Sequence, residues 1–183
     1  TCQERSTGNT RQFSRRFAET DTMKKRVALI YGGKSQEREI SLLTGRQVSS
    51  ALVEKGFHVT GLDLDDNVVT ALAEARPDVV FIALHGKYGE DGCLQGLLDI
   101  LGLPYVGSGV LASALAMNKA ISKKLFSLEG LLCPKDVLLS SCALRKAGLE
   151  GMIAQIARDM AYPLVVKPNK QGSTIGLTVV RSS

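Results

Sequence analysis

The sequence lacks any apolar run near the ~20 residues that a membrane-spanning helix needs, so it does not predict a protein that crosses a bilayer. The hydrophobic segment of a secretory signal peptide is missing as well. The four cysteines include no Cys-x-x-Cys pair, which argues against a zinc ribbon or a dense disulfide framework and suits a reducing compartment. We therefore expect a cytoplasmic protein whose 183 residues form one domain or two small ones.

An excess of positive charge is missing from most of the chain, although the net charge is +5. Residues 1–26 hold seven Lys and Arg against three Asp and Glu, whereas the remaining 157 residues hold 16 basic and 15 acidic side chains. The basic character thus belongs to the N-terminal segment, and the folded part needs no polyanionic partner to explain it. We expect no nucleic-acid partner.

The N-terminal segment, residues 1–22, is rich in Thr, Ser, Arg and Gln and is predicted to be a disordered tail. Met23 precedes the first predicted strand and is interpreted as the natural start, with an upstream extension or an expression remnant before it. The run RQFSRRF is also similar to an organellar transit peptide, although the three acidic residues of the segment argue against that interpretation.

From residue 26 onward, short apolar runs alternate with segments of helical periodicity. The pattern predicts strands at 27–31, 57–64, 79–84 and 104–106, and helices at 37–55, 67–75, 92–101 and 110–127. Ser35 and Ser108 are candidate helix caps. The side chains expected to face the sheet from the first helix are Ile40, Leu43, Val48, Ala51 and Leu52. Repeated strand–helix–strand order with short links predicts a parallel, doubly wound α/β sheet over residues 23–118.

Residues 119–183 have a different organisation. A strand at 137–139 and a helix at 143–160 precede two strands at 164–167 and 176–180, which flank a polar loop with glycines. A hairpin of two strands is marginally stable by itself, so this second domain is interpreted as incomplete.

Two segments imitate nucleotide-binding motifs. Gly33-Lys34-Ser35 is similar to the end of a Walker loop, but Ala28 stands where that loop needs its first glycine. The run GSGVLA at 107–112 fits a loose dinucleotide fingerprint, but its strand is short and no acidic residue follows at the expected distance.

Two better candidates follow strands of the predicted parallel sheet, at the edge where open α/β folds bind ligands. In GGKSQEREIS at 32–41, Glu37 is expected in the first helical turn, where solvent or a ligand can reach it, and it either binds a ligand ammonium or merely complements the helix dipole. In LHGKYGEDG at 84–92, His85 either contacts a ligand or is an ordinary histidine at a strand end.

A third candidate is VVKPNKQGSTIG at 165–176. Lys167 is expected to end a buried strand, and Gly172, Ser173 and Thr174 can expose consecutive backbone N–H groups, an arrangement that binds phosphate. The alternative is a flexible hairpin loop without a ligand.

These three segments, together with FIALHGKYGEDGCLQGLLDILGLPYVGSGVLASALAMNK, resemble the D-alanine:D-alanine ligases of the ATP-grasp superfamily over about residues 25–181. The resemblance implies a Rossmann-like domain at 23–118 and the start of an α+β ATP-grasp domain at 119–183. It implies that ATP phosphorylates one D-alanine, that the amine of a second attacks the acyl phosphate, and that the dipeptide enters peptidoglycan synthesis.

The resemblance also implies roles for individual residues. Glu37 would anchor the ammonium of the first D-alanine, His85 would lie near its carboxylate, and Ser173 would join Glu37 in a catalytic hydrogen-bonded network. The residues implied to bind ATP are Lys119, Lys167, Gly172, Ser173 and Thr174.

The resemblance implies ATP with Mg²⁺ or Mn²⁺ as cofactors, D-alanine as substrate and a possible homodimer. Family members are about twice as long, and their metal ligands fall outside the matched part, so no metal ligand is expected here. Without these ligands the charge on the transferred phosphoryl group has no divalent partner, and we expect the 183-residue chain alone to be inactive. A D-alanine:D-lactate ligase fragment and a non-catalytic binding module remain alternatives.

Overall fold

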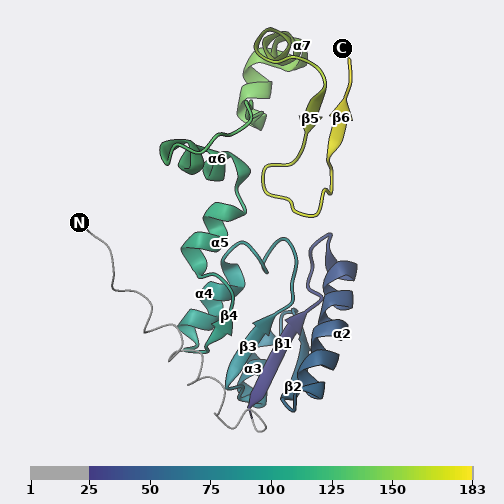
Figure 1. The fold of residues 1–183 in the computed structure, drawn as a ribbon, viewed down its shortest axis with the longest axis vertical. Helices are drawn as coiled ribbons and strands as arrows, with labels where there is room; N and C mark the ends of the chain where they lie inside the picture. The colour runs from purple at the N-terminus through teal and green to yellow at the C-terminus, as the bar shows by residue number, and fades with distance from the viewer. Residues whose placement is uncertain (1–24, 183) are drawn as a thin grey trace, which may run out of the picture. The chain divides into compact units, whose positions relative to one another are not determined.

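The computed structural model describes residues 25–182 (Figure 1). The tail predicted at residues 1–22 lies outside the described residues. Within the described part, no helix is both long and apolar enough to cross a membrane. The chain divides into two compact units. The first contains the described residues up to Lys34, then Arg38–Leu84 and Leu98–Val106, and the second contains Ser35–Glu37, His85–Leu97 and the chain from Gly107 onward.

The first unit is built on a parallel sheet of four strands in the order β2-β1-β3-β4. Its strands are β1 (Arg26–Tyr31), β2 (His58–Asp63), β3 (Val79–Ile82) and β4 (Tyr105–Val106). All three strand pairs are parallel, with Val27 opposite both Val59 and Val79. Leu29, Ile30 and Val80 are fully buried, as expected for apolar runs in a parallel sheet. The predicted α/β class with a parallel sheet is confirmed.

Helix α2 (Arg38–Glu54) packs on β1 and β2, but not with the predicted stripe. Ile40 and Leu43 are 43 % and 52 % exposed, whereas the helix buries Ser41 and Gly45. A Cβ at Gly45 would lie 2.7 Å from Tyr31 Cγ, so the glycine lets the helix approach the strand closely. The prediction for Ile40 and Leu43 is wrong because small residues, which carry no hydrophobic signal, define the contact.

Two further helices belong to the same part of the chain. Helix α3 (Val68–Ala75) contacts β2, and the last three residues of α4 (Cys93–Ile100) fall within the first unit. Ser41 ties together the carboxyl ends of two strands, because its Oγ accepts from Gly32 N at 2.8 Å and donates to Ala83 O at 2.7 Å.

The second unit contains three helices and a hairpin in its C-terminal part, namely α5 (Val110–Ala116), α6 (Lys119–Leu128), α7 (Ser141–Asp159), β5 (Leu164–Val166) and β6 (Thr178–Val180). The single helix predicted at 110–127 is wrong: Asn118 has an extended backbone, and its side chain accepts from Ile121 N to begin α6. Ser108 does not cap α5, since Gly109 occupies that position.

Three details differ from prediction in the remainder of the second unit. Residues 137–139 are not a strand, and α7 is broken at Gly148, whose φ is +69°. The predicted hairpin is confirmed, with Leu164 opposite Val180 and Val166 opposite Thr178 in antiparallel pairs (Figure 1). Its β5 strand is not buried as expected, because Val166 is 49 % exposed.

Candidate functional site

Glu37 is the most unusual polar residue of the second unit. It precedes α2 instead of lying in the first turn, and it is only 1 % exposed, so the prediction of a solvent-accessible carboxylate is wrong. Its backbone N–H donates to Ser35 Oγ at 3.1 Å, and Ser35 Oγ donates to His85 O at 2.8 Å. Ser35 does not directly precede α2 as the predicted cap would, but its hydroxyl holds the turn before the helix and links that turn to the segment after β3.

The two carboxylate oxygens of Glu37 have different surroundings. Oε2 accepts a hydrogen bond of 2.5 Å from Ser173 Oγ, a residue 136 positions away in the sequence. Oε1 is buried and accepts no hydrogen bond within the described part of the chain. A buried acceptor without a partner costs about 1–3 kcal/mol, and more when it is charged. The arrangement is therefore one that a positively charged ligand group would stabilise.

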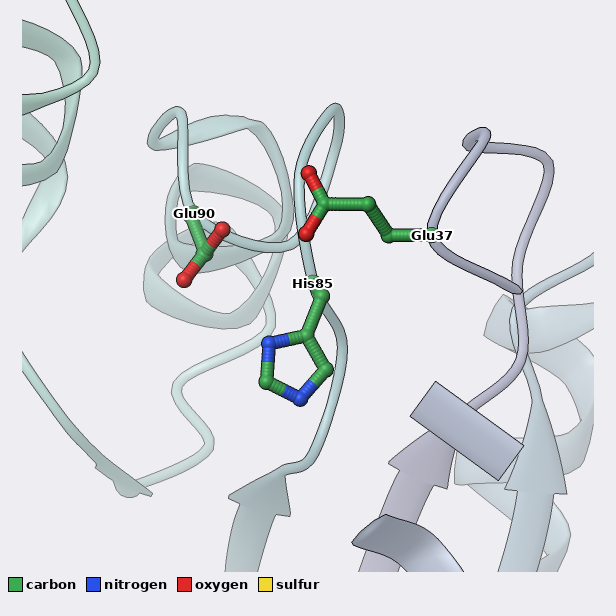
Figure 2. A group of neighbouring side chains, drawn as sticks. All are labelled: Glu37, His85 and Glu90. Atoms are coloured by element: carbon green, nitrogen blue, oxygen red, sulfur yellow. The ribbon is translucent and has the colours of Figure 1, made fainter. Parts of the chain in front are cut away.

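His85 and Glu90 converge on the same place (Figure 2). One ligand atom from each of Glu37, His85 and Glu90 can be chosen so that all three lie within 4.8 Å of one another. Glu37 is buried, His85 is half-buried and Glu90 is exposed, so the group is open at the Glu90 side. Two carboxylates and an imidazole can hold either a metal cation or a protonated amine.

The loop from 85 to 92 positions Glu90, which the sequence analysis did not single out although it lies in the GEDG run. Glu90 Oε2 accepts from Gly86 N at 2.6 Å, and Gln95 Nε2 on α4 donates to Gly89 O at 2.7 Å. A Cβ at Gly86 would lie 2.9 Å from Glu37 Oε1, and the φ of Gly86 is +72°. Glycine is thus required for this close approach.

Asp91 fixes the other end of this loop. Its carboxylate accepts from Tyr88 N at 3.0 Å and from Cys93 N at 3.1 Å, at the start of α4. Burial raises the pKa of Asp91, but these N–H donors together outweigh it and leave the pKa below its ordinary value. The aspartate therefore stays ionised and holds the loop that carries His85 and Glu90.

The glycine-bearing loop between β5 and β6 reaches Glu37 through Gly172 and Ser173. A Cβ at Gly172 would lie 3.1 Å from Glu37 Oε1, and Ile175 N donates to Gly172 O at 3.1 Å to close a tight turn. The central residues of that turn, Ser173 and Thr174, have φ of +48° and +59°, a strained conformation for residues other than glycine. Strain of this kind is concentrated at ligand-binding segments.

The two lysines predicted to bind phosphate behave differently. Lys119 begins α6, and its Nζ donates to Gln171 O at 2.5 Å, which places it beside the glycine-bearing loop. Lys167 follows β5 and is exposed, and among residues 25–182 it forms no hydrogen bond or ion pair with the other site residues. The structure therefore brings together Glu37, His85 and Ser173, and brings Lys119 to the same loop, but leaves Lys167 outside these contacts.

Comparisons with known proteins identify the relatives of this chain. The family model described as "D-ala D-ala ligase N-terminus" matches residues 65–108. The D-alanine–D-alanine ligase of Pelotomaculum thermopropionicum is 49 % identical over 155 residues, which cover 85 % of this chain and 49 % of the relative. The chain is related to the N-terminal half of the D-alanine–D-alanine ligases. It spans about half the length of the curated relatives it matches, as the ligase of Carboxydothermus hydrogenoformans also illustrates, with 43 % identity over 86 % of this chain and 50 % of the relative.

Solved structures of D-alanine–D-alanine ligases have the same fold. The Bacillus anthracis ligase superposes with a TM-score of 0.66 at 34 % identity, covering 87 % of this chain and 50 % of that one. The structure of the same ligase described as complexed with ATP gives a TM-score of 0.63 and covers 86 % of this chain. The resemblance inferred from the sequence motifs is thereby confirmed, whereas the roles of single residues stay predictions.

Proposed function

We propose that this chain forms the part of an ATP-dependent D-alanine–D-alanine ligase that binds the first D-alanine and positions the ATP phosphates. The observation that carries the proposal is the buried, unpartnered Oε1 of Glu37, next to Ser173 and within the Glu37–His85–Glu90 group. The ammonium of an amino acid supplies the hydrogen bonds and the positive charge that this oxygen lacks.

In this proposal, Glu37 binds the ammonium of the first D-alanine, and His85 lies near its carboxylate. A carboxylate against an ammonium keeps that nitrogen protonated and therefore unable to act as a nucleophile. The carboxylate of the first D-alanine is then the group that reacts. It attacks the γ-phosphorus of ATP, ADP leaves, and the unprotonated amine of a second D-alanine displaces phosphate from the acyl phosphate to form the peptide bond.

The phosphate groups of ATP are assigned to the loop between β5 and β6. The backbone N–H groups of Ser173 and Thr174 donate to no acceptor in the described part of the chain, although they lie in a turn beside Lys119. Free N–H groups and a lysine stabilise the charge that spreads over a transferring phosphoryl group. The proposal adds Lys167 and the N–H of Gly172 to the same set.

Magnesium or manganese is part of the proposal only as a cofactor of the whole enzyme. Mg²⁺ prefers near-octahedral oxygen ligands and retains several waters, whereas the Glu37–His85–Glu90 group offers an imidazole and a buried carboxylate. These residues do not fit Mg²⁺ and are not proposed as its ligands. A homodimer stays a prediction.

Binding to the 183-residue chain tests the substrate part of the proposal. Titration calorimetry and amide NMR spectra should detect D-alanine binding at Glu37 and His85, with L-alanine weaker because the opposite chirality misplaces either the ammonium or the carboxylate. Equal responses to D-alanine, L-alanine and acetate would contradict an amino-acid site.

A chimera tests the activity. Residues 25–182 would replace the matching half of the Pelotomaculum thermopropionicum ligase, with which they share 49 % identity. D-Alanine-dependent release of ADP and formation of D-alanyl-D-alanine are expected. A folded chimera that binds ATP but forms no dipeptide would favour a non-catalytic binding module.

A further inference from the structure

Two asparagines that are 51 residues apart join the start of α6 to the loop between β5 and β6. Asn169 Nδ2 donates to Asn118 Oδ1 at 2.9 Å, and Asn169 Oδ1 accepts from Ala120 N at 2.9 Å. The backbone carbonyl of Asn169 accepts from Lys119 N at 3.1 Å, and Asn118 Oδ1 also accepts from Ile121 N at 3.3 Å. We call Asn118 and Asn169 the asparagine clasp.

The clasp occupies the N–H groups that a helix start normally leaves open. Helix N-termini bind anions because their first N–H groups have no partner within the helix. Here the N–H groups of Lys119, Ala120 and Ile121 each have an asparagine acceptor. The start of α6 is therefore committed to holding the loop and is not an open site for phosphate.

The loop is held at two points as a result. Asn169 fixes its beginning to α6, and the bond from Ser173 Oγ to Glu37 Oε2 fixes its middle. Between these points, Gln171 O accepts from Lys119 Nζ at 2.5 Å. Lys119 and the N–H groups of Ser173 and Thr174 are thus held in fixed relative positions before any nucleotide is bound.

We infer that Asn169 is a positioning residue that holds the phosphate-binding loop and Lys119 in register, so that ATP meets an ordered site. The inference rests on the proposed function, because it assumes that this loop binds phosphate. Asn169 does not need to touch the nucleotide. Without the clasp, ATP binding must order the loop itself, and affinity falls because part of the binding free energy is used for ordering.

The chemistry explains why an amide suits position 169. It presents an acceptor to Ala120 N and a donor to Asn118 Oδ1, whereas an aspartate offers acceptors only. Asn169→Asp would keep the bond to the helix and lose the bond to Asn118. Asn118→Asp, by contrast, keeps an acceptor for both Asn169 Nδ2 and Ile121 N, so it is the conservative variant. The double variant would place two carboxylates in contact and should be worse than either single change.

The test uses the full 183-residue chain with ATP and D-alanine as probes, and hydrogen exchange as a readout without ligand. Asn169→Ala should speed amide exchange at residues 119–121 and 170–175 and should weaken ATP binding roughly tenfold, as the loss of two hydrogen bonds implies. D-Alanine affinity should fall less than ATP affinity does, since neither asparagine is proposed to contact the amino acid. Asn118→Asp keeps both acceptor bonds of Asn118, so amide exchange at residues 119–121 and 170–175 should match wild type.

The outcomes separate the inference from the proposed function. Wild-type exchange and ATP affinity in Asn169→Ala would overturn the positioning role while the ligand sites stand. Failure of the wild-type chain to bind ATP would overturn both. If Asn169→Ala does not fold, Asn169→Asp takes its place. That variant loses the bond to Asn118, so its amide exchange without ligand should also be faster at residues 119–121 and 170–175, and unchanged exchange would again overturn the inference.

Discussion

Two buried polar side chains, one in each unit, have opposite hydrogen-bonding states. Ser41 in the first unit is 0 % exposed, and its hydroxyl both accepts from Gly32 N and donates to Ala83 O. Glu37 in the second unit is 1 % exposed, yet one of its carboxylate oxygens has no partner in the described part of the chain. Ser41 is satisfied by groups of the scaffold, whereas under the proposed function a ligand supplies the missing partner of Glu37. Ser41 and Glu37 are thus alike in burial and differ in hydrogen-bond satisfaction.

The largest effect that this comparison predicts is on ligand binding in Glu37→Gln. Hydrogen bonds to charged groups contribute ~1.5–3 kcal/mol, so affinity for D-alanine should fall about ten- to hundredfold. The melting temperature should hold or rise, because the variant removes a buried charge. Calorimetric titration beside thermal unfolding measures both.

Glu39→Gln is the matched control, since Glu39 is also acidic, lies two residues later in the first turn of α2 and is exposed. It should leave both readouts nearly unchanged. If Glu37→Gln binds D-alanine as wild type does, or loses binding only because it unfolds, Glu37 has a structural role like that of Ser41. The proposed difference between the two residues would then be wrong.

The converse effect is expected for Ser41→Ala. Removing the hydroxyl leaves Gly32 N and Ala83 O buried without their partner, which should lower the free energy of unfolding by about 1–3 kcal/mol. Urea unfolding measures the change, and D-alanine affinity at temperatures where the variant is folded should stay within a few-fold. Ser50→Ala, at an exposed position of the same helix, is the control. A variant as stable as wild type would mean that water replaces the hydroxyl without cost.

How far the sequence predicts this molecule depends on how local each signal is. The strands of the first unit are apolar runs bounded by glycine or proline, and their parallel order follows from strand–helix alternation, so both were predictable. The face of α2 was not, because Ser41 and Gly45 form the contact and neither is apolar. The break between α5 and α6 was missed because Asn118 fits a helical period until its capping bond is seen.

The site divides in the same way. Glu37, His85 and Ser173 could be chosen as candidates from loops at expected places, and the structure brings them together. Glu90 carries no local signal that separates it from an ordinary solvated carboxylate in a glycine-bearing loop. The unpaired state of Glu37 Oε1 depends on a bond to Ser173, 136 residues away, and no local pattern reports it.

A smaller effect is expected from pH in the first unit. The Arg38 guanidinium hydrogen-bonds to the Asp63 carboxylate and, with Gly33 N, holds its pKa below the ordinary value, against a smaller opposing effect of burial. Because the folded pKa is depressed, the stabilisation is present above the unfolded pKa of about 3.9 and is lost as pH falls through the folded pKa.

Asp63→Asn should therefore make stability depend less on pH in the acid range. At neutral pH it should lower the free energy of unfolding by less than Ser41→Ala does, since the ion pair is partly exposed and screened by water. Thermal unfolding from neutral pH down to acid measures it, with wild type in parallel. An identical acid limb in both proteins would assign the pH dependence to other carboxylates, among them Asp78, whose pKa is also lowered by bonds from Arg26.

The smallest effect concerns backbone strain, in which two turns of the chain differ. The turn after β1 has glycine at both positive-φ positions, Gly32 and Gly33, whereas the loop between β5 and β6 has Ser173 and Thr174 in that region. A left-handed conformation costs a residue with a side chain about 1–2 kcal/mol, and glycine avoids this cost. Glycine is also more flexible in the unfolded chain, which offsets about 0.5–1 kcal/mol of the gain. Thr174→Gly should thus stabilise the chain by no more than ~1 kcal/mol.

Thr174→Ala is the matched control, because it keeps the strained φ and removes only the hydroxyl, which donates to Ser173 O at 2.6 Å. Denaturant unfolding of both variants separates strain from the hydroxyl. If Thr174→Gly is destabilised as much as Thr174→Ala, the hydroxyl bond and not φ decides the loop's stability. If Thr174→Gly is more stable but binds ATP more weakly, the strained threonine keeps the loop ordered for its ligand. The strain at Thr174 and the unpaired oxygen of Glu37 would then be alike, because each lowers stability and serves ligand binding.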